Sequence, residues 1–176
     1  MGQGANEVTP NEIIDGILRR EGGFVDHPAD KGGATNWGIT QATLAEWFGR
    51  PATVDDVKSL TEHEAREIYR EQYIVRPGFL GIENEAVRAL VIDCAVNHGV
   101  KRAVMLLQNA ARVSPDGILG PKTREAVNRM TASVAYRRLC AQRVRLYGEI
   151  ITSKPSQAVF ARGWCNRVAE FIEEVV

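Results

Sequence analysis

Apolar positions recur along most of the chain at intervals of three and four residues, which is the spacing of one face of an α-helix. Helix-start patterns accompany them, since Thr9-Pro10-Asn11-Glu12 and Thr61-Glu62-His63-Glu64 both have the order of a capping box. The first helix has an apolar face made of Ile13, Ile14, Ile17 and Leu18. The pattern predicts helices over residues 10–21, 40–48, 53–58, 61–73, 83–98, 100–111, 121–131, 133–152 and 156–174.

The one segment with a strand pattern is 24–39. Gly32-Gly33 offers a turn there, and Trp37-Gly38-Ile39-Thr40 leads into the next predicted helix. We therefore expect a mainly α fold with a small irregular β or loop region near residues 22–39.

Composition is that of an ordinary globular protein. The 176 residues are 44% hydrophobic and 25% charged, which excludes a disordered or low-complexity chain. No apolar run approaches the roughly 20 residues that span a bilayer. The first residues show neither the basic nor the apolar part of a secretory signal, so we expect synthesis in the cytoplasm. Three widely spaced cysteines argue against a disulfide framework.

Charge is balanced overall but not along the chain. Lys and Arg number 22, as do Asp and Glu, and this balance disfavours a nucleic-acid partner. Residues 1–95 hold 9 basic and 16 acidic side chains, whereas residues 96–176 hold 13 and 6. The basic half could face a polyanion such as a cell wall, or its charges could simply be solvated. The same two alternatives apply to four arginines of helix 133–152: Arg137, Arg138, Arg143 and Arg145.

Glu21 is the first candidate for chemistry. It follows Ile17 by four residues and Leu18 by three, so helical spacing places it on the apolar face of the first helix. Gly22-Gly23 then ends the helix. Partial desolvation and the negative end of the helix dipole both raise the pKa of such a carboxyl, which suits a general acid. The alternative is a solvated Glu beside a glycine cap.

The residues after Glu21 favour a ligand-binding loop. Glycines let a bulky ligand approach the backbone, and both Asp26 and Asp30 are within loop reach of Glu21. A second carboxylate across a sugar ring is the usual arrangement for glycoside hydrolysis. Asp30 could alternatively be a turn residue ahead of Lys31-Gly32.

The chain resembles glycoside hydrolase family 108 in the run from Arg20-Glu21-Gly22-Gly23-Phe24 to Gly32-Gly33-Ala34-Thr35-Asn36-Trp37-Gly38-Ile39-Thr40. This is a family of phage and bacterial N-acetylmuramidases with a lysozyme-like fold. It also resembles the family's C-terminal predicted peptidoglycan-binding region, in Asp93-Cys94-Ala95-Val96-Asn97-His98-Gly99, in Leu107-Gln108 and in Asp116-Gly117-Ile118-Leu119-Gly120-Pro121-Lys122-Thr123. The resemblance spans roughly residues 10–174.

This resemblance implies roles for particular residues. The family's catalytic Glu falls on Glu21. A looser similarity to phage-type lysozymes places their Asp at Asp30 and their Thr at Asn36, beside Thr35. An Asn amide differs from a hydroxyl in reach and donors, so which group orients the water stays open. Trp37 is either a stacking surface for a sugar or a core residue.

In the second half, Asp93 and Asn97 are candidates for contacts with sugar hydroxyls. They lie four residues apart on one helix face, and the alternative is a buried Asp93 that caps a neighbouring loop. A Cys94–His98 nucleophilic pair is disfavoured, because Cys94 belongs to the apolar face. The histidines lack zinc-ligand spacing, and we expect neither a metal nor an organic cofactor.

The predicted protein is a peptidoglycan hydrolase that cleaves the β-1,4 bond between N-acetylmuramic acid and N-acetylglucosamine. Residues 1–95 would form the catalytic lobe and residues 96–176 a wall-binding helical lobe. The alternatives are a lytic transglycosylase and a non-catalytic wall-binding or secretion-accessory protein. We expect a monomer without a membrane span that reaches the cell wall through a holin or a secretion system.

Overall fold

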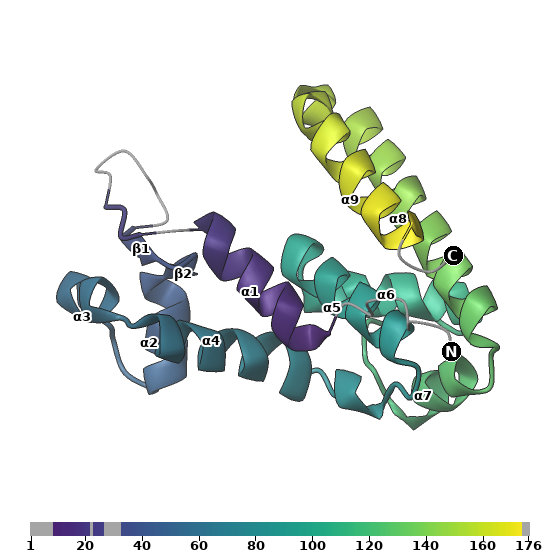
Figure 1. Ribbon diagram of the computed structural model, residues 1–176, viewed down its shortest axis with the longest axis horizontal. Coiled ribbons are helices and arrows are strands. Elements are labelled where there is room, and N and C mark those ends of the chain that lie inside the picture. The colour runs from purple at the N-terminus through teal and green to yellow at the C-terminus, as the bar shows by residue number, and fades with distance from the viewer. Residues whose placement is uncertain (1–8, 22, 27–32, 174–176) are drawn as a thin grey trace, which may run out of the picture. The chain divides into compact units, whose positions relative to one another are not determined.

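The computed structural model describes residues 9–21, 23–26 and 33–173. The chain divides into two compact units: residues 11–72 form the N-terminal unit, and the C-terminal unit begins at Tyr73. Figure 1 shows that both are built mainly from helices. In the described part of the chain, no helix is both long and apolar enough to cross a membrane.

The described part of the N-terminal unit consists of one small β-hairpin and four α-helices. Its elements are α1 (Pro10–Glu21), β1 (Thr35–Asn36), β2 (Ile39–Thr40), α2 (Gln41–Phe48), α3 (Val54–Ser59) and α4 (Glu62–Arg70). The apolar face of α1 is buried as predicted, with Ile13, Ile14, Ile17 and Leu18 each at most 5% exposed. Burial of such side chains is the main favourable contribution to the stability of this unit.

Threonines begin three of these helices. The Thr40 hydroxyl accepts a hydrogen bond from the Thr43 backbone N–H and so caps α2. Thr53 and Thr61 each form a complete capping box with the acidic residue three positions later. The capping box predicted at 61–64 is therefore confirmed.

The hairpin turns on two residues, Trp37 and Gly38. Its strands pair antiparallel, with Thr35 opposite Thr40 and Asn36 opposite Ile39. Both turn residues have positive φ, 54° and 73°, which is the pattern of a type I′ turn and matches the twist of the strands. Glycine adopts such a φ freely, whereas a bulky tryptophan does not.

The C-terminal unit is a helical bundle followed by a long helical hairpin. Its elements after η1 (Glu71–Val75), a π-helix at the boundary, are η2 (Phe79–Gly81), α5 (Glu85–His98), α6 (Val100–Ala111), α7 (Pro121–Asn128), α8 (Ala132–Ser153), η3 (Pro155–Phe160) and α9 (Ala161–Glu173). Helices α5, α6 and α8 pack on one another, and α9 folds back along α8 (Figure 1).

Gln108 on α6 holds the loop that precedes α7. Its side chain is fully buried, and its amide nitrogen donates to Asp116 Oδ1 at 2.6 Å, the Ile118 carbonyl at 3.0 Å and Thr123 Oγ1 at 3.1 Å. The Gln108 amide oxygen accepts the Gly117 N–H at 2.9 Å. The Leu107-Gln108 and Asp116–Thr123 motifs thus form one network within the fold.

The mainly α fold is confirmed, with small differences at helix ends. Helix α4 ends at Arg70, and the residues predicted to continue it form the π-helix. Residues 155–160 form a 3-10 helix, so the last α-helix begins at Ala161 rather than at residue 156. The compact units divide at 72/73, whereas the functional division at 95/96 stays a prediction.

Candidate functional site

The end of α1 carries the residue predicted to be the general acid. Helix α1 runs without interruption to Glu21, three residues after the buried Leu18 and four after the buried Ile17. The backbone therefore brings position 21 to the apolar face, as the spacing predicted. The side chain of Glu21 lies outside the described residues, as does the whole of Asp30. Asp26 is exposed, next to the backbone bridge between Val25 and Thr35.

Trp37 is held firmly at the tip of the hairpin. Its indole Nε1–H donates to the Leu60 carbonyl at 3.1 Å, and its own carbonyl accepts the Tyr69 hydroxyl at 3.2 Å. One bond goes to the α3–α4 connection and the other comes from α4, and together they offset the strain of the positive φ of Trp37. Trp37 remains partly exposed, so part of its ring is open to a ligand.

A cavity of about 300 Å³ lies beside Trp37. Its walls come from the hairpin, from α1 and from the start of α4, and its lining consists of Asp15, Leu18, Arg19, Trp37, Glu62 and Arg66. Arg66 forms ion pairs with Asp15 and Glu62, so the cavity has charged walls on two helices and an aromatic ring on the third side. Such a mixture of one aromatic face and several hydrogen-bonding groups suits a sugar.

Asn36 and Thr35 hold the hairpin in place, whereas the next residue, Trp37, exposes part of its ring. Asn36 is 5% exposed, and its amide nitrogen faces three backbone carbonyls at the end of α3, those of Val57, Lys58 and Leu60, at 3.0 to 3.3 Å. It thereby ties the hairpin to carbonyls at the end of α3, of which Val57 also accepts the Leu60 N–H and Leu60 also accepts the Trp37 indole. Thr35 pairs its backbone with Val25 at 2.8 Å in both directions. In the described structure both residues hold the hairpin, and Asn36 is too buried to meet a substrate directly.

Asp93 also differs from expectation. It was predicted to line a cleft, but it is 1% exposed and forms ion pairs with Arg143 of α8 at 2.6 Å and Arg167 of α9 at 2.7 Å. A carboxylate enclosed in this way has no free oxygen for a sugar. The alternative prediction, a buried Asp93, agrees better with the structure. Its partners, however, are arginines from two later helices and not a loop.

Asn97 and His98 follow on the same helix and are more accessible. The Asn97 side chain is exposed and donates to the Asp93 carbonyl at 2.8 Å. Both residues line a second cavity, of about 640 Å³, in the C-terminal unit. Cys94 is fully buried, and burial raises the pKa of its thiol to about 12, so a thiolate nucleophile is disfavoured as the sequence indicated.

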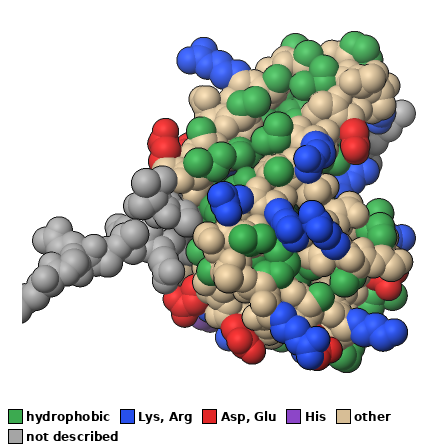
Figure 2. Space-filling model, turned by 90° about the vertical axis from the view of Figure 1, so that its right-hand side faces the viewer, with side chains coloured by type: hydrophobic (Ala, Val, Ile, Leu, Met, Phe, Trp, Pro, Cys, Tyr) green, Lys and Arg blue, Asp and Glu red, His purple; other side chains and the backbone are tan. Residues whose placement is uncertain are grey.

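The arginines of α8 are not a single solvated face. Arg137 and Arg145 are exposed, whereas Arg138 is partly buried and Arg143 is 1% exposed. The buried side chains of α8 include Leu139, Leu146 and Tyr147, and Arg143 lies three or four residues from each of them. That spacing is the signal that could have identified Arg143 as a core residue. Figure 2 looks on the side of α7 and α8 and shows Lys and Arg interspersed with apolar side chains.

Among residues 9–21, 23–26 and 33–173, no group of three or more His, Cys, Asp or Glu side chains is arranged to hold a metal ion.

Comparison with known proteins decides the family. Residues 14–99 match the family model described as Glycosyl hydrolase 108, and residues 102–169 match the one described as Predicted Peptidoglycan domain. The structure is similar to that of SagA from Brucella abortus, with 37% sequence identity and a TM-score of 0.74 over 91% of this chain and 89% of that chain. The comparison with curated proteins gives no match.

The chain belongs to glycosyl hydrolase family 108. Its fold is accordingly the mainly α, lysozyme-like one expected from the sequence, and its activity is of the glycoside hydrolase kind. The second match supports peptidoglycan as its partner. In this family 108 protein, the first match covers most of α1, the hairpin and the Trp37 cavity, whereas the second covers α7, α8 and most of α6 and α9.

Proposed function

We propose that the protein is an N-acetylmuramidase, which hydrolyses the β-1,4 bond between N-acetylmuramic acid and N-acetylglucosamine in peptidoglycan. The observation that carries the proposal is a glutamate at the end of the apolar-faced α1, within the glycosyl hydrolase 108 match. In this reaction Glu21 protonates the leaving glycosidic oxygen. The enzyme acts at the wall, because peptidoglycan lies outside the cytoplasmic membrane, and a holin or secretion system would release it.

The second carboxylate of the reaction comes from the loop after α1. Asp30 is the proposed residue and Asp26 the alternative, and either would act on water or on the positive charge of the oxocarbenium ion. Their distance from Glu21 sets the stereochemistry, with about 5–5.5 Å for retention and about 6.5–9.5 Å for inversion. Asp30→Asn and Asp26→Asn identify the residue, because removal of the true partner slows turnover far more than the other change.

Trp37 supports the proposal as a sugar-binding surface. The type I′ turn fixes its backbone, and hydrogen bonds fix its indole and its carbonyl, so little side-chain entropy is lost when a sugar stacks on the ring. The neighbouring Asp15, Glu62 and Arg66 offer polar atoms at the edge of the same cavity. We place the sugar next to the cleaved bond in this cavity.

The test is digestion of purified sacculi by wild type and Glu21→Gln, followed by mass spectrometry of the products. Wild type should release fragments that end in reducing N-acetylmuramic acid. Glu21→Gln should lose at least about a hundredfold in rate, because it keeps the size of the side chain but not the transferable proton. The matched control is Glu67→Gln, an exposed position of α4 in the same unit.

Each other outcome has a defined meaning. Anhydro ends would identify a lytic transglycosylase, and an absence of glycan fragments would identify a non-catalytic wall-binding protein. Wild-type rates from a folded Glu21→Gln protein would remove Glu21 from the mechanism.

A further inference from the structure

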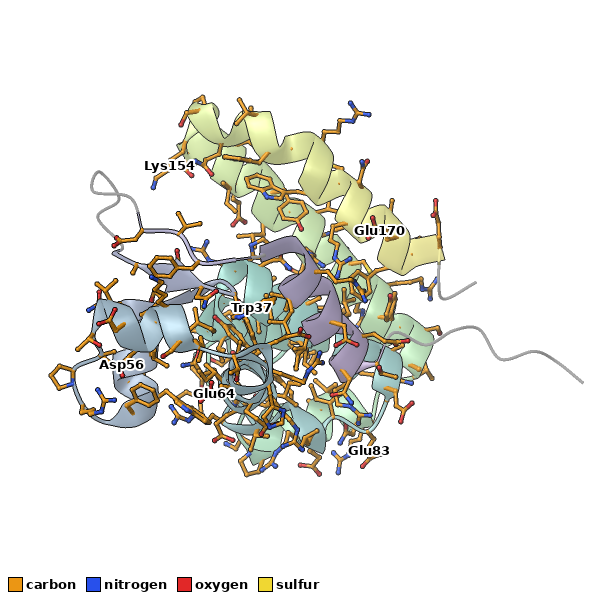
Figure 3. The ribbon with its side chains drawn as sticks, turned by 60° about the vertical axis from the view of Figure 1, so that its left-hand side comes forward. Trp37, Asp56, Glu64, Glu83, Lys154 and Glu170 are labelled. Atoms are coloured by element: carbon orange, nitrogen blue, oxygen red, sulfur yellow. The ribbon has the colours of Figure 1, made fainter. Side chains whose placement is uncertain are left out.

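The C-terminal unit contains a cavity of about 640 Å³ that has no part in the reaction proposed above. It lies between the end of α5, the start of α6 and the α8–α9 turn. The residues that matter for its chemistry are His98, Arg102, Glu149, Lys154, Gln157 and Trp164. Figure 3 shows Lys154 at the α8–α9 turn, with Glu170 farther along α9.

Trp164 and His98 line one wall of the cavity, and the buried Tyr147 packs against both rings. Tyr147 stacks on Trp164 with a centroid distance of 5.2 Å and an interplanar angle of 20°. The ring of His98 meets Tyr147 edge-on at 5.5 Å. Trp164 is partly exposed, so this wall offers a flat apolar surface beside polar groups.

Buried charges hold this wall in place. Asp93 is paired with Arg143, and the Arg143 Nε–H donates to the Tyr147 hydroxyl at 2.6 Å. A chain of contacts therefore runs from Asp93 through Arg143 to Tyr147 and the rings it touches. Apolar side chains could pack three helices without the desolvation cost of an ion pair. The arrangement instead pre-orients Tyr147 and Trp164, as a binding site requires.

The charges at the opening of the cavity favour an anion. Arg102 and Lys154 are exposed cations, and within the described residues no carboxylate pairs with either. Glu149 contributes one negative charge, which leaves an excess of one positive charge. His98 is neutral near pH 7, because burial and the positive Arg143 lower its pKa to about 4. Its Nε2 atom is buried and has no hydrogen-bond partner in the described part of the chain.

We propose that this cavity binds the stem peptide of peptidoglycan, with Arg102 and Lys154 holding its carboxylates and Trp164 packing against its apolar groups. Gln157 supplies hydrogen bonds to the peptide amides. The inference rests on the proposed function in one respect, namely that peptidoglycan is the substrate. It adds a second binding site, on α5, α6 and the α8–α9 turn. This site binds the peptide, whereas the Trp37 cavity binds the glycan.

Calorimetric titration of the full chain carrying Glu21→Gln tests the site without turnover. The probes are the disaccharide N-acetylglucosaminyl-N-acetylmuramic acid with a tetrapeptide stem, the same disaccharide without the peptide, and the free tetrapeptide. The stem-bearing probe should bind at least about tenfold more tightly than the bare disaccharide, as expected for charge-assisted hydrogen bonds. Equal affinity for these two probes would overturn the proposal.

Charge substitutions then locate the binding. Arg102→Gln and Lys154→Gln should each weaken binding of the stem-bearing probe about tenfold. Glu149→Gln should strengthen it severalfold, because it removes the only anion among the lining residues, and a damaged fold would not produce that gain. The control is Arg145→Gln, an exposed arginine of α8 that lines another groove. Parent-like affinity in all three variants would overturn the assignment.

The two proposals fail separately. Reducing-end products from wild type without preference for the stem would leave the muramidase standing and remove the peptide site. Stem binding without glycan cleavage would leave the peptide site standing and remove the muramidase.

Discussion

The Trp37 hairpin and the α5–α8–α9 cluster are held in place by different kinds of interaction. In the hairpin region, the side chains of Asn36, Trp37 and Tyr69 all bond to backbone carbonyls. In the cluster, Asp93 and Arg143 bond to each other, and both are 1% exposed. The first arrangement uses neutral groups that donate to backbone carbonyls, whereas the second buries opposite charges that depend on one another.

This difference determines what each region can tolerate. Loss of a neutral hydrogen bond costs about 1 kcal/mol, and somewhat more when it leaves a buried group unsatisfied. Loss of one member of a buried ion pair strands the other charge in a medium that solvates it poorly. The hairpin should therefore weaken gradually under substitution, while the cluster should fail at the first change of charge.

The largest effect is expected from Asp93→Asn. The change keeps the size of the side chain but leaves the buried Arg143 without a counter-ion, so the free energy of unfolding should fall by about 3–5 kcal/mol. Urea unfolding followed by circular dichroism measures it. Asp93→Leu combined with Arg143→Met should recover much of the loss, because no fully buried charge is then stranded and Arg167 keeps its ion pair with Glu170. Asp55→Asn, an exposed control on α3, should change stability by less than about 0.5 kcal/mol.

Asp93→Asn with the stability of the control would show that water already reaches Arg143. The two regions would then be held with similar strength, and the contrast between them would disappear.

Acidification should distinguish the two regions next. Burial and the nearby Arg143 lower the pKa of His98 to about 4, from about 6.5 in an unfolded chain. The unfolded state therefore binds more protons between these values, so the stability that neutral His98 contributes is present above pH 6.5 and is lost as pH falls toward 4. The loss should be on the order of 2–3 kcal/mol.

The measurement is the free energy of unfolding of wild type and His98→Asn from pH 7.5 to pH 4. The difference between the two proteins should be constant above pH 7 and should shrink as the pH falls. His63→Asn is the matched control, since His63 is exposed in the N-terminal unit and should leave the wild-type profile unchanged. A constant difference between wild type and His98→Asn at all pH values would mean that the imidazole is solvated.

The sequence predicted the elements well because local rules govern them. The spacing of Ile13, Ile14 and Ile17 identified the buried face of α1, and the threonine capping boxes identified helix starts. Both signals lie within one or two helical turns. The end of α4 was missed because a π-helix forms there, and no local pattern at Glu71–Val75 favours it over a continued α-helix.

The site was harder to predict because its groups come from distant segments. Asp93 and Asn97 share a helix face, but Arg143 and Arg167, which bury Asp93, are 50 and 74 residues farther along the chain. The role of Asn36 likewise depends on carbonyls more than 20 residues away. Arg143 is the exception, because its spacing from Leu139 and Tyr147 marked a core position that its charge concealed.

Within the hairpin region, Asn36→Ala should have the larger effect of two substitutions. It removes all three contacts of the Asn36 amide with the end of α3 at once, although Val57 keeps the Leu60 N–H and Leu60 keeps the Trp37 indole, and the summed cost should be about 1–3 kcal/mol. Asn36→Asp should be worse than alanine, because it replaces a donor with a carboxylate that faces the same carbonyl oxygens. Thermal unfolding of the three proteins checks the order, and an aspartate variant as stable as the parent would contradict it.

The smallest effect is expected from Trp37→Phe. Phenylalanine keeps an aromatic face but loses the Nε1–H that donates to the Leu60 carbonyl, and Asn36 still donates to that oxygen at 3.2 Å. Because no buried acceptor is left unsatisfied, the cost should be only about 0.5–1 kcal/mol, measured by urea unfolding. Activity on sacculi should also change little, since a ring remains, whereas Trp37→Ala should raise the substrate concentration needed for half-maximal rate about tenfold by removing the stacking face. Equal activity of the alanine and phenylalanine variants would limit Trp37 to an anchor of the turn and leave the sugar-binding surface to the charged walls of the cavity.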